Sequence, residues 1–134
     1  MKIILDACAV IAMVKNETGS EIVEAYLLDN QHHCMIHSIN LCEVYYGFLR
    51  SDGEAFAKQI IQGLQQAGVA IRSDLTISFW QQVGHYKATI NRISLADCFA
   101  LALANQEKGL VLTSDRKEFE PVTRLNICPI EFIR

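Results

Sequence analysis

Short apolar segments alternate with longer helical segments over the whole chain, and this alternation is the feature that most restricts its fold. Short strands separated by helices are typical of βα units, whose strands lie parallel and whose helices cover both faces of the sheet. We therefore expect an α/β fold, a three-layer sandwich with a central, mostly parallel sheet flanked by helices. The predicted strands cover residues 2–5, 34–37, 69–71, 110–113 and 126–132.

Helix boundaries follow from polar residues that precede helical patterns of apolar residues. The run Thr18-Gly19-Ser20-Glu21 has the form of a capping box, which predicts a helix start. Ser38, Asp74 and Ser94 are expected to cap later helices, and Gly109 to end the last one. The predicted helices cover about residues 7–14, 19–30, 39–50, 55–67, 75–91 and 95–108. Neither a repeat nor a linker interrupts this order, so we expect one domain over residues 1–134.

Composition excludes several classes of protein. The chain has 134 residues, of which 51% are hydrophobic and 20% charged, so it can bury a core and is not of the disordered class. No apolar run approaches the ~18 residues of a membrane helix, and the N-terminus lacks a signal-sequence pattern, so we expect a cytoplasmic protein. Five cysteines without a C-x-x-C pair argue against a disulfide framework and a four-cysteine zinc site. The net charge of −3 does not indicate nucleic-acid binding. It does not exclude such binding, because acids gathered in one pocket lower the net charge while a basic rim around it still attracts phosphates.

Four acidic residues occupy positions that suggest chemistry. Asp6 follows the first predicted strand and Asp115 follows the fourth. Ligands of parallel sheets bind in the crevice beyond the carboxyl ends of the strands, which is where both acids fall. Glu43 and Asp97 lie inside strongly apolar helical segments, and acids are rarely buried unless they are paired or bind a metal. The pattern indicates that the buried carboxylates require a cation.

Each acid also has a simpler interpretation by itself. Asp97 could complete a capping box with Ser94, and Glu43 could face outward or meet a buried arginine. Asp6 could merely end a strand, and Asp115 could belong to a polar turn. One metal site explains all four together, and carboxylates without histidine form an all-oxygen site suited to Mg²⁺ or Mn²⁺. Two such ions ~3.5–4 Å apart can activate water and stabilise the leaving oxygen in phosphodiester hydrolysis.

Other sites of α/β proteins fit less well. A phosphatase of the haloacid dehalogenase type needs D-x-D after the first strand, where this chain has Asp6-Ala7-Cys8, and a receiver domain needs an acidic pair there. Neither G-x-G-x-x-G nor a Walker A sequence is present to bind a nucleotide cofactor. A zinc site of mixed cysteine and carboxylate ligands stays open as an alternative. Only Cys8 is placed to join it, because Cys42 and Cys98 should point away from whatever Glu43 and Asp97 bind.

Over essentially the whole chain, the acids and their surroundings resemble the PIN domain family, and specifically the small VapC-type toxin ribonucleases of type II toxin–antitoxin pairs. The resemblance is carried by Ile4-Leu5-Asp6-Ala7, Asn40-Leu41-Cys42-Glu43-Val44, Ser94-Leu95-Ala96-Asp97-Cys98 and Leu112-Thr113-Ser114-Asp115. It implies that the metal-binding acids are Asp6, Glu43, Asp97 and Asp115. Thr113, Ser94 and Glu118 are the outer residues expected to support them. The chain departs from the family at Cys8, where relatives often have Ser, Thr or Asn, and a thiol is a poorer hydrogen-bond partner.

The resemblance implies an Mg²⁺- or Mn²⁺-dependent endoribonuclease. Its partners would be an RNA substrate, a cognate antitoxin whose tail enters the acidic crevice, and a second copy of the chain. Apolar helices around Tyr26, Leu27 and Ile60 are the expected dimer surface. A catalytically weak scaffold or RNA- or protein-binding module of the same fold is the alternative. Phosphates of a bound RNA could be held by residues near the crevice in sequence, namely Arg92, Arg116, Lys117 and Lys15.

Overall fold

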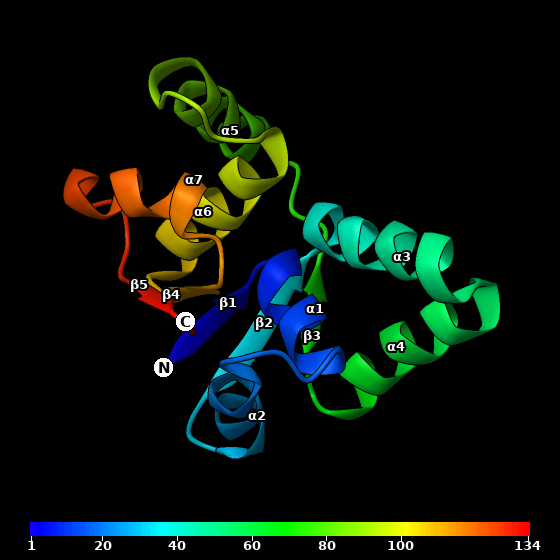
Figure 1. Ribbon diagram of the computed structural model, residues 1–134. Coiled ribbons are helices and arrows are strands. Elements are labelled where there is room, and N and C mark those ends of the chain that lie inside the picture. The colour runs from blue at the N-terminus through cyan, green and yellow to red at the C-terminus, as the bar shows by residue number, and fades with distance from the viewer.

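The computed structural model describes residues 1–134 and contains one sheet of five strands, in the order β3-β2-β1-β4-β5 (Figure 1). All four strand pairings are parallel, which confirms the predicted α/β class. In a parallel sheet all strands end at the same edge, so residues distant in sequence meet there. The strands are β1 (Lys2–Leu5), β2 (His33–His37), β3 (Ala70–Arg72), β4 (Leu110–Thr113) and β5 (Ile130–Phe132).

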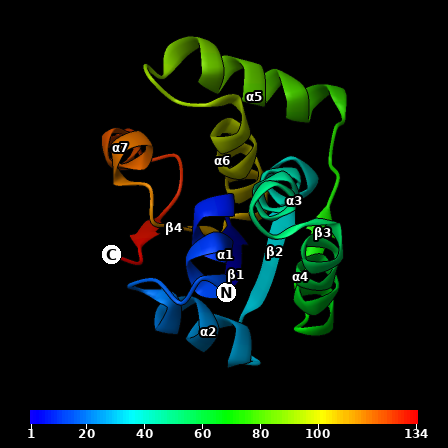
Figure 2. The ribbon, with the colours of Figure 1, turned by 45° about the vertical axis from the view of Figure 1, so that its right-hand side comes forward.

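Helices cover both faces of the sheet, as the alternation of segments predicts. They are α1 (Ala7–Val14), α2 (Ser20–Leu28), α3 (Ser38–Asp52), α4 (Glu54–Gln66), α5 (Ile77–Thr89), α6 (Leu95–Glu107) and α7 (Arg116–Phe119), followed by the 3₁₀ helix η1 (Glu120–Leu125). Figure 1 shows α3 and α4 side by side, with α1 between them and the group of α5, α6 and α7. Figure 2 shows α5 across the end of α6 that lies away from the sheet.

Alternating side chains of the central strands supply two separate cores. Ile3 and Leu5 pack with α1, α2, α3 and α4, whereas Ile4 packs with α5, α6 and α7. All three side chains are fully buried, and each contributes roughly 1.5–3 kcal/mol of hydrophobic stabilisation. Because successive side chains of a strand point to opposite faces of the sheet, each face packs against its own layer of helices, and the sheet is the middle layer of three. None of the helices combines the length and the apolar character needed to cross a membrane.

Three of the predicted helix caps are wrong. His37, not Ser38, caps α3, because its ring nitrogen Nδ1 accepts the backbone N–H of Ile39 at 3.1 Å. Thr76, not Asp74, caps α5, because the Asp74 carboxylate is already bonded by a neighbouring arginine and glutamine. The capping box at 18–21 is not formed either: Gly19 precedes α2 in a left-handed conformation, with φ of 96° and no side-chain cap.

The end of α6 and the start of the final strand also differ from the prediction. Gly109 follows the end of α6 as predicted, but Lys108 rather than this glycine adopts the left-handed conformation that ends the helix. A Cβ atom at Gly109 would lie 2.5 Å from Ile4 Cδ1 and 2.7 Å from the Lys2 carbonyl oxygen. This glycine is therefore required by the close approach of β4 to β1. The final strand begins at Ile130 rather than at residue 126, because Asn126 adopts a left-handed conformation after η1 and residues 126–129 form an irregular turn.

Candidate functional site

Asp6 lies at the junction of β1 and α1 with only 1% of its surface exposed. One carboxylate oxygen accepts the backbone N–H of Ala9 at 2.8 Å, which caps α1, and the other accepts the Thr113 hydroxyl. These bonds favour the ionised form, but burial outweighs them and raises the pKa of Asp6 to about 7, with the negative charges of Asp115 and Glu43 adding to the effect. The carboxylate is thus held rigidly in a place where its own charge is poorly stabilised.

Thr113 connects the ends of the two central strands. Its buried hydroxyl donates to Asp6 and accepts the backbone N–H of Asp115 at 2.9 Å. Asp115 in turn caps α7, with its Oδ1 accepting the backbone N–H of Glu118 at 3.1 Å. A hydroxyl group can donate one hydrogen bond and accept another at the same time, whereas an apolar side chain of the same size can do neither. Thr113 therefore fixes the relative placement of two of the predicted acids.

Three carboxylates lie close together at the N-terminal ends of α6 and α7. Oxygen atoms of Asp97, Asp115 and Glu118 all lie within 4.8 Å of one another. Ser94 caps α6 as predicted, because its hydroxyl accepts the backbone N–H of Asp97 at 3.1 Å. Burial raises the pKa of Asp97 strongly, and a hydrogen bond to Glu118 and the charge of Asp6 raise it further. The Ser94 cap and a role in the acidic cluster are therefore compatible for Asp97.

Glu43 lies in the first half of α3 and is half-buried. Burial and then the negative charge of Glu118 raise its pKa. The four predicted acids Asp6, Glu43, Asp97 and Asp115 thus come together in the fold. Glu118, expected only as an outer residue, lies among them. We refer to these five residues as the acidic cluster.

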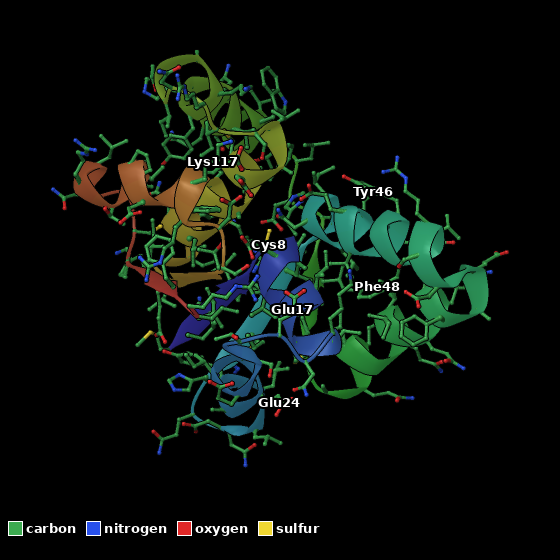
Figure 3. The ribbon with its side chains drawn as sticks, in the orientation of Figure 1. Cys8, Glu17, Glu24, Tyr46, Phe48 and Lys117 are labelled. Atoms are coloured by element: carbon green, nitrogen blue, oxygen red, sulfur yellow. The ribbon has the colours of Figure 1, made fainter.

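The cysteines near the acids in sequence do not form a second kind of site. Cys8 lies in the first turn of α1 (Figure 3), where burial and the charges of the nearby acids raise the pKa of its thiol to about 12. A protonated thiol is a poor metal ligand. Cys42 lines a groove between α3 and α4, and Cys98 is buried in the core under α6, so both point away as predicted.

Asn40 is a site residue that the sequence alone did not reveal. Its side chain is fully buried, its Nδ2 donates to the carbonyl of Ala96 at 3.0 Å, and its Oδ1 has no partner. The bond joins α3, one turn before Glu43, to the residue that precedes Asp97. The spacing of Asn40 and Glu43 indicates that both side chains lie on the same face of α3, because residues three apart share a helix face. Its partner on α6 could not be identified without the fold.

The donor set of the acidic cluster suits a hard divalent cation. It consists of carboxylate oxygens, and no Lys or Arg forms an ion pair with any of its five members. Buried acids without a counter-charge raise one another's pKa, which a divalent ion would reverse. Mg²⁺ and Mn²⁺ prefer such oxygen ligands, whereas zinc sites are richer in nitrogen and sulfur. The residues present therefore fit the metal expected from the sequence.

Comparisons with known proteins show the family and the fold of the chain. The model of the PIN domain family matches residues 3–125. No curated protein sequence matches. Among solved structures, the DNA-bound VapBC from Salmonella typhimurium superposes with a TM-score of 0.76 at 21% identity, over 100% of this chain and 99% of that one. VapBC-1 from nontypeable Haemophilus influenzae gives 0.74 at 20% identity, over 99% and 98%.

A third similar structure is Mycobacterium tuberculosis VapC20, a sarcin–ricin loop cleaving toxin, with a TM-score of 0.72 at 13% identity over 90% of this chain and 94% of that one. At these identities the likeness shows a shared fold. The family model adds a match over most of the sequence, including Asp6, Glu43, Asp97 and Asp115. The chain belongs to the PIN domain family.

Proposed function

We propose that this protein is an Mg²⁺- or Mn²⁺-dependent endoribonuclease and the toxin of a VapC-type toxin–antitoxin pair. The observation that carries the proposal is the acidic cluster, which gathers carboxylates from four separate elements at the carboxyl edge of a parallel sheet. The family match and the fold shared with VapBC structures support it. VapC20, which shares this fold, cleaves the sarcin–ricin loop, and this supports RNA as the substrate class.

In this proposal Asp6, Glu43, Asp97 and Asp115 hold the metal, directly or through water. When bound, the ion supplies a water of lowered pKa and positive charge for the phosphate oxygens. Thr113 orients Asp6 and Asp115 through its two hydrogen bonds. Hydrolysis of the RNA would add one water molecule across a P–O bond and leave one phosphate monoester and one hydroxyl, and the ion held by these residues would supply the charge stabilisation for this reaction.

Ser94 and Glu118 have supporting roles. Ser94 fixes the first turn of α6 and so the position of the Asp97 backbone. Glu118 raises the pKa of Asp97, and its carboxylate lies within 4.8 Å of those of Asp97 and Asp115, close enough to share a cation with them. We propose that Glu118 holds metal-bound water or completes the ligand set when Asp97 and Asp115 are ionised.

The proposed partners follow from charge and from the apolar surface. A cationic side chain of an antitoxin tail would compete with metal for the acidic cluster, since charge-assisted hydrogen bonds to carboxylates are strong. Homodimerisation also belongs to the proposal. Of the residues expected at the dimer surface, Leu27 and Ile60 line a shallow groove of about 180 Å³ between α1, α2 and α4. Tyr26 is instead bonded to Glu131.

A non-catalytic scaffold is the second candidate function. It is favoured by Cys8 alone, because a protonated thiol beside Asp6 gives weaker support than the hydroxyl or amide frequent in relatives. Restoring an amide with Cys8→Asn separates the two: an enzyme should keep or gain turnover, whereas a scaffold should show none in either form.

Cleavage of a mixed RNA pool by the purified protein tests the proposal. Reactions contain Mg²⁺, Mn²⁺ or EDTA, with Asp97→Asn as the matched variant. We expect cleavage only with metal and only by the wild-type protein. Cleavage that survives in Asp97→Asn would contradict the assigned site, and metal binding without turnover on any RNA would favour the scaffold.

A further inference from the structure

A polar pocket of about 850 Å³ opens beside the acidic cluster. Asn91 and Arg92 line it from the turn between α5 and α6, and Lys117 and Pro121 line it from α7 and η1. Asp115 and Glu118 of the acidic cluster form the rest of its wall, and Pro121 is the one apolar side chain that takes part. The pocket therefore places basic and amide groups next to the proposed metal position.

Two of the four basic residues considered from the sequence are occupied elsewhere. The Arg116 guanidinium lies 4.5 Å from the centre of the Phe132 ring, and its Nε donates to the Arg134 carbonyl at 2.8 Å. The Lys15 ammonium lies 6.0 Å from the centre of the Phe48 ring. Neither contact directs these charges into the pocket.

Arg92 and Lys117 differ from this pair. They share the pocket with Asp115 and Glu118, yet neither forms an ion pair with any carboxylate within 4.0 Å. Lys117 extends from α7 on the side of α5 and α6 (Figure 3). The backbone of Arg92 has a φ of 61°, which is a left-handed conformation that glycine or asparagine adopts more easily. Two free cations thus line a space whose other wall is acidic.

We propose that Arg92 and Lys117 form a subsite for the RNA phosphate next to the one that is cleaved. The inference rests on the proposed function, since it requires the scissile phosphate at the acidic cluster. A guanidinium binds two phosphate oxygens at once, and an ammonium adds a point charge. The Asn91 amide can donate a further hydrogen bond. A strand whose scissile phosphate meets metal at Asp115 then has its neighbouring phosphate between the two cations, so the subsite sets the register of the RNA.

The test compares Arg92→Gln/Lys117→Gln with a matched control that removes two exposed lysines elsewhere, Lys58→Gln/Lys108→Gln. Lys58 lies on α4, and Lys108 lies at the far end of α6 from Asp97. The first substrate is an RNA oligonucleotide with a mapped cleavage position. The second is bis(p-nitrophenyl) phosphate with Mn²⁺, a diester without any neighbouring phosphate.

We expect KM for the RNA to rise about tenfold or more in Arg92→Gln/Lys117→Gln, because hydrogen bonds to charged groups are lost. The slope of log(kcat/KM) against log[salt] should flatten by about 0.7 for each phosphate charge no longer neutralised. Hydrolysis of the small diester by this variant should fall far less than cleavage of the RNA, and the control pair should behave as the wild type on both substrates. A further RNA carries a neutral methylphosphonate at the neighbouring linkage. On this RNA the KM of the wild type should rise to that of Arg92→Gln/Lys117→Gln.

Other outcomes overturn the inference. Equal losses in both double variants would mean a general charge effect rather than a subsite, and an unchanged KM for RNA would mean that the pocket binds no phosphate. An advantage that persists on the methylphosphonate RNA would place the cations elsewhere on the strand. If the wild type cleaves neither substrate, the proposed function itself fails and the subsite with it.

Discussion

At the scale of single residues, the site depends on one hydroxyl that joins two carboxylates. Thr113 is separated from Asp6 by over a hundred positions in sequence, yet it bonds Asp6 and the backbone of Asp115 at once. Without a cation the buried negative charge of Asp6 destabilises the folded protein, because burial already raises the pKa of Asp6 to about 7. Rigid ligands with poorly stabilised charge are the condition in which metal binding gains most.

The first prediction concerns Thr113→Val, a change of similar shape that removes the hydroxyl. It leaves the buried Asp6 oxygen and the Asp115 N–H without their partner, so we expect a loss of about 1–3 kcal/mol in the free energy of unfolding. Mn²⁺ affinity should fall as well, since both carboxylates lose their orientation. Urea denaturation and calorimetric Mn²⁺ titration measure these effects, and Thr113→Ser, which keeps the hydroxyl, should retain most of both. Equal behaviour of the Val and Ser variants would contradict the role of the hydroxyl.

A second prediction concerns the pH dependence of the metal-free protein. The pKa values of Asp6 and Asp97 are raised in the folded state, so the fold binds more protons than the unfolded chain once pH exceeds their ordinary value of 3.8. Stability from these groups is therefore fully present at acidic pH and is lost as pH rises toward and beyond 7. In EDTA at pH 8, Asp97→Asn should melt at a higher temperature than the wild type, and at pH 4 the difference should shrink. A lower melting temperature for Asp97→Asn at pH 8 would mean that the acid is already compensated.

At the scale of elements, helix starts depend on contacts that sequence patterns do not contain. His37 caps α3 through Nδ1, which leaves the proton on Nε2 to donate to the Asp74 carbonyl at 2.9 Å. Its ring lies 5.4 Å from the Phe79 ring and 4.8 Å from the Phe99 ring, measured between centroids. Histidine is not among the preferred caps, so Ser38 was the natural prediction. Asp74 was a sound cap by type, but Arg72 holds its carboxylate at 2.8–2.9 Å.

The third prediction follows from this junction. His37→Ala should remove a helix cap and open a cavity beside the Phe79 and Phe99 rings, which together should cost about 2–4 kcal/mol of unfolding free energy. The matched control is His33→Ala at the exposed start of β2, where a change within about 0.5 kcal/mol is expected. Urea denaturation of the two variants measures both values. A His37→Ala loss as small as that of the control would show that the ring supports neither the cap nor the aromatic contacts.

At the scale of the whole molecule, strand order decides which acids meet. The alternation of strands and helices was enough to predict the parallel sheet, and its shared carboxyl edge was enough to bring Asp6 and Asp115 together. Glu43 and Asp97 were predictable because an acid in an apolar helix needs a partner. The places of Glu118 and Asn40 were not, because one depends on how α7 turns after β4 and the other on how α3 packs against α6. Such packing is set by the whole core rather than by neighbours in sequence.

The fourth prediction uses global stability as the readout of metal binding. A ligand that binds only the folded state at a hundred times its Kd stabilises by about 2.7 kcal/mol, which raises Tm by several degrees for a chain of this size. Mg²⁺ or Mn²⁺ should produce this rise in the wild type, and Asp97→Asn should lose most of it. Ca²⁺ and Na⁺ at matched ionic strength separate binding from charge screening. An equal rise in both proteins would place the bound ion outside the acidic cluster.

The most direct measurement is diffraction from crystals soaked in Mn²⁺, with data collected at the manganese absorption edge. We expect one or two anomalous peaks at the carboxyl edge of the sheet, each about 2.0–2.3 Å from oxygens of the acidic cluster, with Asp6 and Asp97 among the direct or water-mediated ligands. The absence of a peak there at saturating Mn²⁺, or a peak held by Cys8 or by histidines elsewhere, would contradict the proposed metal site.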